Sequence, residues 1–267
     1  MTTEPKISVI TPTFNSGRYI AQTIQSVLNQ THTNWEMNIV DDGSTDDTCA
    51  LVEQFAEKDR RIKLSRLERN LGAAHARNTG LQMSCGRFIA YLDADDLWYT
   101  TKLARQVEFM LENQCGFSCV SYEVIDDGGI SCNKHIRMRK RLDYRGFLVN
   151  NLIQTVGVMV DLNQVSKHLL VMPNIRRRQD AATWLQVLKN GNDCFGMEEV
   201  LAKYRRTAGS LSSDTSKSVR GVWHLYRKLE RLPLAFACYC FARYAILAVW
   251  KRVYLNAYWL PKTPAST

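Results

Sequence analysis

The sequence lacks the features that mark a membrane-spanning protein or one held together by disulfides. A spanning helix needs roughly 20 apolar residues, whereas the longest run, residues 234–250, has 17 and includes Arg243 near its centre. The eight cysteines include no C-x-x-C pair, and several lie in apolar runs, where a thiol behaves as a small hydrophobic group. The start of the chain shows no basic stretch leading into an apolar one. We therefore expect a protein of the reducing cytoplasm with free thiols.

Acidic residues are almost missing from the C-terminal end. Residues 217–267 hold one Asp or Glu against nine Lys or Arg, whereas residues 1–133 hold 18 against 12. This asymmetry indicates different partners for the two ends of the chain. No nucleic-acid-binding motif accompanies the basic residues, and the acidic first part would repel a polyanion, so we expect no nucleic acid partner.

Strand and helix periodicities alternate along the first half. The short β-rich runs, each followed by apolar residues at helical spacing, are 6–14, 35–40, 61–67 and 87–92. The alternation predicts an α/β fold with a mostly parallel central sheet and helices on both faces. The second half is less regular, with a strand at 117–125 and a loop that enters a helix within 176–191.

Acidic residues directly follow two of these strands. Asp41 and Asp42 end the second strand, and Asp93, Asp95 and Asp96 end the fourth. Because parallel strands bring their carboxyl ends to one edge, where open α/β sheets bind ligands, we expect these acids to converge. Carboxylates there suit hydrogen bonding to a ribose or a base, or the binding of Mg²⁺ or Mn²⁺ together with substrate phosphates. The alternative is that both stretches are only turns and helix caps.

Four longer stretches resemble family 2 glycosyltransferases, which are inverting enzymes with the GT-A fold. They are "SVITPTFNSGRYIAQTIQSVLNQTHTNWEMNIVDDGSTDDT", "RNLGAAHARNTGLQMSCGRFIAYLDADD", "QDAATWLQV" and "YRRTAGSLS", in order over about residues 5–213. The chain is most similar to members that build bacterial surface polysaccharides. The resemblance implies a nucleotide-sugar-binding half at 1–125, an acceptor-binding half with the catalytic base at 126–216, and a basic, aromatic-rich helical segment at 217–267.

The resemblance also implies a UDP-sugar site on the first half. Thr11 lies where the family's nucleotide pocket begins, and Asp41 would read the uracil imide. The residues implied to approach the base and ribose are Arg69 to Gly72 and Arg77.

Metal and catalytic roles follow from the same resemblance. Asp93 and Asp95 form the D-x-D pair that would bind Mn²⁺ or Mg²⁺, with Asp95 as the more direct ligand. Asp180 matches the catalytic base, although Gln179 stands where the family usually has Glu. This departure affects the expected orientation of the base more than its identity. The alternative role for Asp180 is an N-cap of the following helix.

Two arginines near the end of the resemblance are candidates to contact the diphosphate. Arg205 and Arg206 occupy the matching positions, and the alternative is a solvated strand end. The family often has His near position 207, where this chain has Thr207, so we expect no further metal or phosphate contact there.

The implied activity is metal-dependent transfer of a hexose or N-acetylhexosamine from a UDP-sugar to a lipid-linked glycan. Such an acceptor is an undecaprenyl-diphosphate sugar or a lipid A core, in O-antigen, capsule or lipopolysaccharide core assembly. Inversion of an α-linked donor would give a β-glycosidic bond. One general base and a cation at the leaving diphosphate supply the chemistry that this reaction needs.

The apolar run near the C-terminus is flanked by basic residues and is rich in aromatics. Arg227, Lys228 and Arg231 precede it, and Lys251 and Arg252 follow it. This pattern favours a helix lying in the headgroup layer of an anionic membrane, at the cytoplasmic face of the bacterial inner membrane. A core helix or a dimer interface is the alternative.

Two other classes of function fit part of the pattern. A Mg²⁺-dependent phosphatase or receiver-like module also uses acids at strand ends, but it normally has a nucleophilic Asp after the first strand, where this chain has Thr11-Pro12-Thr13. A non-catalytic membrane scaffold of a polysaccharide assembly is the second alternative. It predicts that Asp95→Ala and Asp180→Asn leave the cellular phenotype intact.

Overall fold

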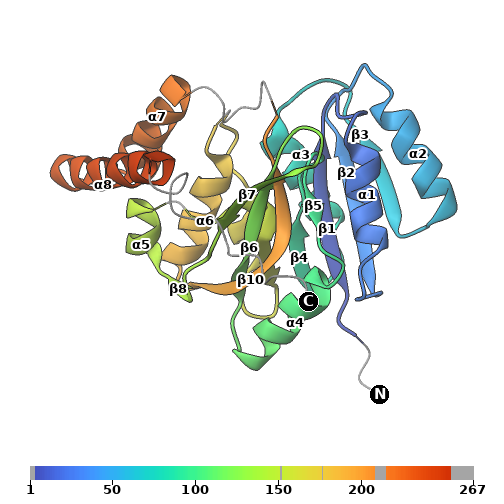
Figure 1. Cartoon of the computed structure of the whole chain (residues 1–267), viewed down its shortest axis with the longest axis horizontal. Helices are drawn as coiled ribbons and strands as arrows, with labels where there is room; N and C mark the ends of the chain where they lie inside the picture. Colours follow the sequence, from blue (N-terminus) through green and yellow to red (C-terminus); the bar gives the residue numbers. More distant parts are fainter. Residues whose placement is uncertain (1–3, 151, 176, 208–214, 254–267) are drawn as a thin grey trace, which may run out of the picture.

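The computed structural model describes residues 4–150, 152–175, 177–207 and 215–253. Their strands form one sheet in the order β3-β2-β1-β4-β9-β6-β10-β5, with β7 beside β6 and β8 beside β10 (Figure 1). The strands are β1 (Ile7–Thr13), β2 (Trp35–Asp41), β3 (Ile62–Arg66), β4 (Phe88–Tyr91), β5 (Leu97–Trp98), β6 (Phe117–Ile125), β7 (Ser131–Ile136), β8 (Arg141–Leu142), β9 (Val158–Asp161) and β10 (Cys194–Arg205). The end of the motif "YRRTAGSLS" and the last part of the C-terminal segment, 254–267, lie outside the described residues.

Strands β1, β2 and β4 are buried along their whole length, as expected for parallel strands covered on both faces. β1 pairs in parallel with β2 and β4, and β2 pairs in parallel with β3. The register places Thr13 beside Asp41 and Ile10 beside Tyr91. These strands therefore end at the same side of the sheet, which we call the carboxyl edge.

The short strand β9 connects the two halves of the sheet. It pairs in antiparallel fashion with β4 on one side and with β6 on the other, so β6 runs in the same direction as β4. β10 then pairs in parallel with β6. The carboxyl ends of β6 and β10 consequently reach the carboxyl edge as well, and they bring residues of the second half to the acids of the first.

Two hydrophobic clusters cover the two faces of the sheet. Helices α1, α2 and α4 contribute to one cluster with Val9, whereas α3, α5 and α6 contribute to the other with Ile10. Neighbouring strand residues point to opposite faces, which explains why adjacent residues of β1 enter different clusters. These helices are α1 (Ile20–Leu28), α2 (Thr48–Lys58), α3 (Ala73–Met83), α4 (Lys102–Glu112), α5 (Tyr144–Val149) and α6 (Gln179–Lys189). The predicted α/β fold with helices on both faces of a mostly parallel sheet is confirmed.

The C-terminal helices pack at one end of the molecule (Figure 1). They are α7 (Thr215–His224), the π-helical turn η3 (Leu225–Leu229) and α8 (Leu234–Val253). Ala237 and Cys240 of α8 join the same core cluster as α6.

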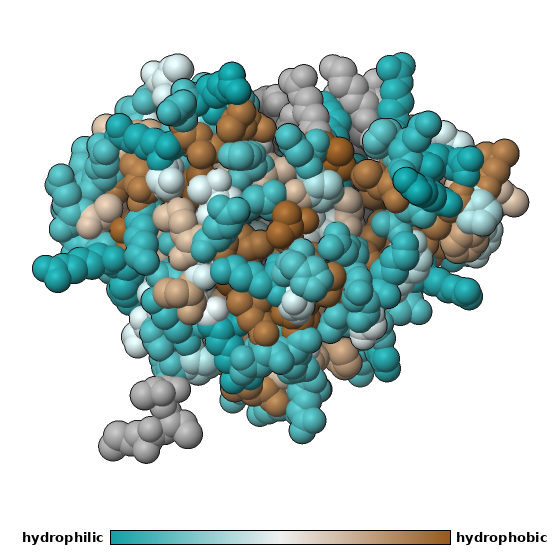
Figure 2. All heavy atoms as spheres, turned by 180° about the vertical axis from the view of Figure 1, so that it is seen from behind, coloured by the Kyte–Doolittle hydropathy of each residue, from teal (hydrophilic) through white to brown (hydrophobic). Residues whose placement is uncertain are grey.

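The opposite face of α8 is exposed and partly apolar. Tyr239 and Ile246 are 54% and 64% exposed. Figure 2, turned by half a turn, shows hydrophobic side chains at this end of the molecule. Within the described part of the chain, no helix is long and apolar enough to cross a membrane. α8 therefore combines a core-packed face with an apolar face that no described residue covers.

Candidate active site

Loop 93–96, which follows β4, is held in place at the carboxyl edge by three elements. The N–H of Leu92 donates to the carbonyl of Ile10 on β1. The hydroxyl of Thr23 on α1 lies 2.8 Å from the carbonyl oxygen of Ala94. The backbone N–H of Arg205, at the end of β10, donates to the carboxylate of Asp96 at 2.8 Å. The acids after β2 and β4 thus share one edge with residues that arrive from the second half of the chain.

The side of the edge formed by β1 and β2 carries buried polar groups. The Oγ1 atoms of Thr11 and Thr13 are buried and have no hydrogen-bond partner among the described residues. The carboxylate of Asp41 accepts hydrogen bonds from the N–H and the hydroxyl of Ser44, at 2.9 and 2.5 Å. Its orientation is therefore fixed by a turn of its own loop, while the hydroxyl groups of Thr11 and Thr13 have no partner among the described residues.

Asp42, to which the sequence assigned no specific role, fixes the loop ahead of α3. Its two carboxylate oxygens accept hydrogen bonds from the N–H groups of Leu71 (2.7 Å) and Gly72 (2.8 Å). Gly43 has a φ of +79°, and a Cβ there would lie 3.1 Å from the backbone of Arg69. Asp42 and Gly43 together bring the Arg69–Gly72 loop against the end of β2, and Arg69 itself is exposed. The only signal for this in the sequence is the "DDG" turn.

Arg77 of α3 places a buried guanidinium among carboxylates. Its Nη2 donates to Oδ1 of Asp93 at 2.5 Å. Burial lowers the pKa of Arg77, but Asp93 and then Asp180 outweigh this effect, so the pKa is raised overall. The Nε and Nη1 groups of Arg77 are buried and have no partner within the described residues. Asp93 and Asp180, from opposite halves of the chain, thus act on one guanidinium that retains unused donors.

The acids of loop 93–96 oppose one another's ionisation. Burial, followed by the charge of Asp93, raises the pKa of Asp95 to about 6. Burial, followed by the charges of Asp95 and Asp93, raises the pKa of Asp96 well above its usual range. Arg77 and Arg205 therefore offset the cluster only in part.

Arg205 is buried beside the acidic loop. It is only 2% exposed, so it is not a solvated strand end. Its guanidinium donates to the carbonyl oxygens of Asp95 (2.7 Å) and Asp127 (3.0 Å) and to the side-chain oxygen of Gln22 (2.8 Å). Each guanidinium nitrogen thus donates to a protein oxygen, and Arg205 fixes the position of loop 93–96. Its contact with the diphosphate remains a prediction, because a guanidinium carries five N–H donors. Arg206 is exposed, and its diphosphate contact remains a prediction.

The oxygen ligands of loop 93–96 fit a hard divalent cation. The described residues include no cluster of three or more side chains that would hold a metal alone. Mg²⁺ and Mn²⁺ sites of this kind use one or two carboxylates and complete their shell with substrate phosphates and water. Partial burial and the charge of Asp93 raise the pKa of Asp95, and a bound cation would supply the positive charge that favours its ionised form. Asp95 and Asp93 are therefore suited to this ion.

Sequence comparison finds relatives that extend over nearly the whole chain. Residues 8–167 match the model of glycosyl transferase family 2. A putative teichuronic acid biosynthesis glycosyltransferase of Bacillus subtilis, TuaG, is 45% identical over 250 residues, which cover 94% of this chain and 98% of that protein. WfgD of Escherichia coli, a UDP-Glc:alpha-D-GlcNAc-diphosphoundecaprenol beta-1,3-glucosyltransferase, is 35% identical over 93% of this chain and 95% of its own length.

Solved structures share the fold at low sequence identity. TarS of S. aureus, in complex with UDP-GlcNAc, is similar with a TM-score of 0.68 and 20% identity, over 94% of this chain and 74% of that chain. The mannosyltransferase PcManGT of Pyrobaculum calidifontis, with GDP-Man and Mn²⁺, gives a TM-score of 0.68 and 18% identity over 94% and 76%.

The region matched by the family model contains the first-half residues of the site. Residues 8–167 contain all of β1 except Ile7, strands β2 to β9, and both acidic loops of the carboxyl edge. The shared fold extends this likeness to the elements that bring in Asp180 and Arg205. The chain therefore belongs to glycosyl transferase family 2 and has the GT-A fold.

Proposed function

We propose that this glycosyltransferase is a metal-dependent, inverting enzyme that moves a hexose or N-acetylhexosamine from a UDP-sugar to a lipid-linked glycan. The observation that carries the proposal is the ion pair of Asp93 with Arg77, whose pKa the charge of Asp180 also raises, so that the D-x-D loop and the proposed base act on the same guanidinium. The donor side is residues 1–125, and the acceptor side is residues 126–216.

Asp180 is the proposed general base. It accepts the proton of the acceptor hydroxyl while that oxygen attacks the anomeric carbon from the face opposite the leaving group. A positioned base contributes about 10²–10⁴-fold to such a step. Attack on an α-linked donor from this side yields a β-linked product.

Asp95 and Asp93 would hold Mn²⁺ or Mg²⁺, which when bound neutralises the diphosphate as it leaves. Arg206 is exposed after β10 and would add a positive charge on the same side. Arg205 keeps Asp95 in place through its backbone.

The nucleotide would occupy the part of the carboxyl edge between β1, β2 and α3. The hydroxyl of Thr11 and the Nε and Nη1 donors of Arg77, which have no partner in the described part of the chain, are available to it. Asp41 would accept from the uracil imide, and the Arg69–Gly72 loop would close on the base and ribose. TarS in complex with UDP-GlcNAc and the UDP-Glc named for WfgD support a uridine donor.

The proposed acceptor is a sugar on undecaprenyl diphosphate or a lipid A core, in O-antigen, capsule or related surface polysaccharide assembly. WfgD and WfaP are named for a GlcNAc-diphosphoundecaprenol acceptor, and TuaG for teichuronic acid biosynthesis. The exposed apolar face of α8 and the nine basic residues of 217–267 suit the anionic, cytoplasmic face of the inner membrane.

Thermal unfolding with and without UDP plus Mn²⁺ tests the donor site, with Asp95→Ala beside the wild type. Ligand at about 100 times its Kd stabilises the folded state by roughly 2.7 kcal/mol, which is a shift of several degrees for a domain of this size. A shift that requires metal and disappears in Asp95→Ala supports the proposal. No shift with UDP, GDP or dTDP would favour a non-catalytic scaffold instead.

A further inference from the structure

The residue directly before α6 has an unusual backbone conformation. Arg178, the N-cap of this helix, has φ 64° and ψ 19°, which is the left-handed region. Side chains other than Gly, Asn and Asp rarely adopt this region unless other contacts impose it. The carbonyl of Arg178 accepts the N–H of Ala182 at 2.9 Å and so closes the first turn of the helix. Asp180 lies inside that turn, so the conformation of Arg178 helps to fix the start of the helix that carries Asp180.

Two contacts of Arg178 come from the C-terminal helices. Its Nη2 donates to the hydroxyl of Tyr244 on α8 at 3.1 Å. A Cβ on Gly221 of α7 would lie 3.4 Å from Cγ of Arg178, so α7 passes directly beside this side chain. Both α7 and α8 therefore contact Arg178, the N-cap of α6.

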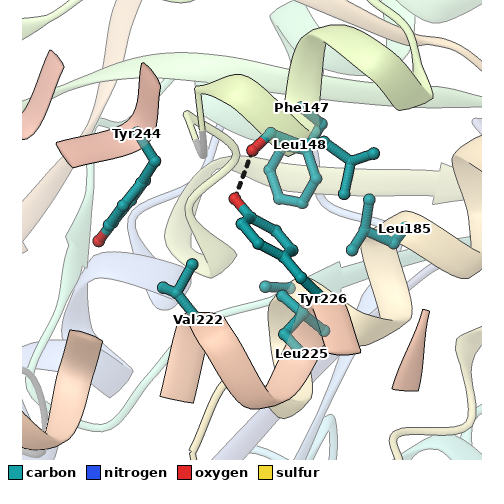
Figure 3. Close-up of a pocket in the computed structure, with 8 residues that line it drawn as sticks. Phe147, Leu148, Leu185, Val222, Leu225, Tyr226 and Tyr244 are labelled. Carbon is teal, nitrogen blue, oxygen red and sulfur yellow. Dashed lines mark hydrogen bonds between the residues drawn. The ribbon is translucent and has the colours of Figure 1, made fainter. Parts of the chain in front are cut away.

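The same helices pack along the next turn of α6 (Figure 3). Ala181 and Leu185 of α6 line a small apolar pocket with Val222 of α7 and with Tyr226 and Tyr244. Tyr226 donates its hydroxyl to the carbonyl of Leu148 on α5 across this pocket. The pocket thus contains two tyrosine hydroxyl groups. The hydroxyl of Tyr244 is hydrogen-bonded to Arg178, the N-cap of α6, whereas the hydroxyl of Tyr226 is hydrogen-bonded to α5.

We propose that Arg178 and Tyr244 are positioning residues, through which the C-terminal helices hold Asp180 in its reactive orientation. The inference rests on the proposed role of Asp180 as the general base. A base displaced by about 1 Å loses on the order of 10²-fold in rate. Loss of the Tyr244 hydroxyl therefore lowers turnover although Tyr244 touches neither the donor side of the site nor the acidic loops.

Tyr244→Phe tests the proposal, because it keeps the ring and removes only the hydroxyl. Tyr226→Phe is the matched control, since it removes the other hydroxyl of the same pocket. Transfer is measured with UDP-glucose, Mn²⁺ and a synthetic GlcNAc-diphospho-lipid. We expect kcat to fall about tenfold in Tyr244→Phe, with the UDP plus Mn²⁺ thermal shift and the donor KM unchanged. Tyr226→Phe is expected to lower Tm and keep kcat.

A second pair of measurements separates positioning from general stability. Arg178→Gly, which adopts a positive φ without strain, should match Tyr244→Phe, and the double variant should show no further loss of kcat. Amide hydrogen exchange of residues 179–184 needs no substrate, and it should be faster in Tyr244→Phe than in Tyr226→Phe.

Equal exchange in the two tyrosine variants overturns the proposal whatever the activity, as does a parallel loss of kcat, UDP affinity and Tm in Tyr244→Phe. Full turnover by Asp180→Asn would instead refute the proposed base, while the exchange experiment would still decide the role of Tyr244.

Discussion

Two buried arginines flank the acidic loop 93–96, and they differ in how their hydrogen bonds are used. The guanidinium of Arg205 donates to carbonyl oxygens of Asp95 and Asp127 and to the side chain of Gln22. The guanidinium of Arg77 has an ion pair with Asp93, while its Nε and Nη1 have no partner among the described residues. Among the described residues, every guanidinium nitrogen of Arg205 therefore has a hydrogen-bond partner, whereas two of the three guanidinium nitrogens of Arg77 do not.

This difference in hydrogen bonding indicates a structural role for Arg205 and a ligand-binding role for Arg77. A buried donor without a partner costs about 1–3 kcal/mol, so such groups are rare in folded proteins unless they serve a ligand or a reaction. The unsatisfied Oγ1 of Thr11 belongs to the same edge as Arg77. We therefore expect substitutions on the Arg77 side to change function more than stability, and substitutions of Arg205 to change stability first.

The largest expected effect is at Asp180, on the Arg77 side. Asp180→Asn removes the proposed proton acceptor and keeps the shape of the side chain, so kcat should fall by about 10²–10⁴-fold. The UDP plus Mn²⁺ thermal shift should remain. Asp127→Asn, on the Arg205 side, is the control, because its backbone carbonyl and not its carboxylate holds Arg205. A loss of ligand binding together with turnover in Asp180→Asn would show that Asp180 is structural.

The two arginines themselves are expected to respond in opposite ways. Arg205→Met leaves several buried acceptors without a donor and should cost about 3–5 kcal/mol, a fall in Tm of roughly 10 °C. Arg77→Met removes two unsatisfied donors, and its partner Asp93 is 30% exposed and can be hydrated.

The Tm of Arg77→Met without ligand should therefore stay within about 3 °C of the wild type, while the stabilisation by UDP plus Mn²⁺ is lost. Calorimetry of both variants with and without ligand distinguishes them. Equal losses of stability would remove the distinction between the two sides.

The effect of substituting Asp95 on the stability of the folded protein is expected to depend on pH. Its pKa is about 6 in the folded protein, against an ordinary value of 3.8, because burial and Asp93 disfavour the charge. The folded form therefore binds more protons between these pH values, and its stability falls as pH rises through that window. Above pH 6, Asp95→Asn should stabilise the metal-free protein by on the order of 2 kcal/mol. Below pH ~4 the substitution should leave the stability unchanged, because Asp95 is then protonated in both the folded and the unfolded form.

Thermal unfolding in EDTA across this pH range measures the effect. Glu57→Gln, which removes an exposed carboxylate of α2, should show no comparable change. A lower Tm for Asp95→Asn at neutral pH would mean that other contacts already satisfy the carboxylate.

The carboxyl edge was predictable from the sequence only in its first half. Long apolar runs and the acids that directly follow them locate β1, β2 and β4, and these parallel strands have to end together. The strand β9 is four residues long, too short to be distinguished from other apolar runs, yet it decides the direction of β6. The register of β10 decides which arginine of the pair Arg205 and Arg206 is buried. That register shifts at Met197 and Val200, where pairing with β6 is irregular, and no local pattern indicates these shifts.

The smallest expected effect concerns α8. One face of this helix is packed within the protein, and the other face is available for a partner. The face with Ala237 and Cys240 is packed in the core, and the face with Ile246 is exposed. Ile246→Glu should weaken binding to vesicles of anionic lipid by about tenfold, since burial of such a side chain contributes roughly 1.5–3 kcal/mol. Leu111→Glu, the same kind of change at an exposed residue of α4, should not alter flotation with the vesicles. If both variants bind as the wild type does, while the UDP plus Mn²⁺ shift is intact, the exposed face of α8 is not the membrane contact, and a second protein copy becomes its expected partner.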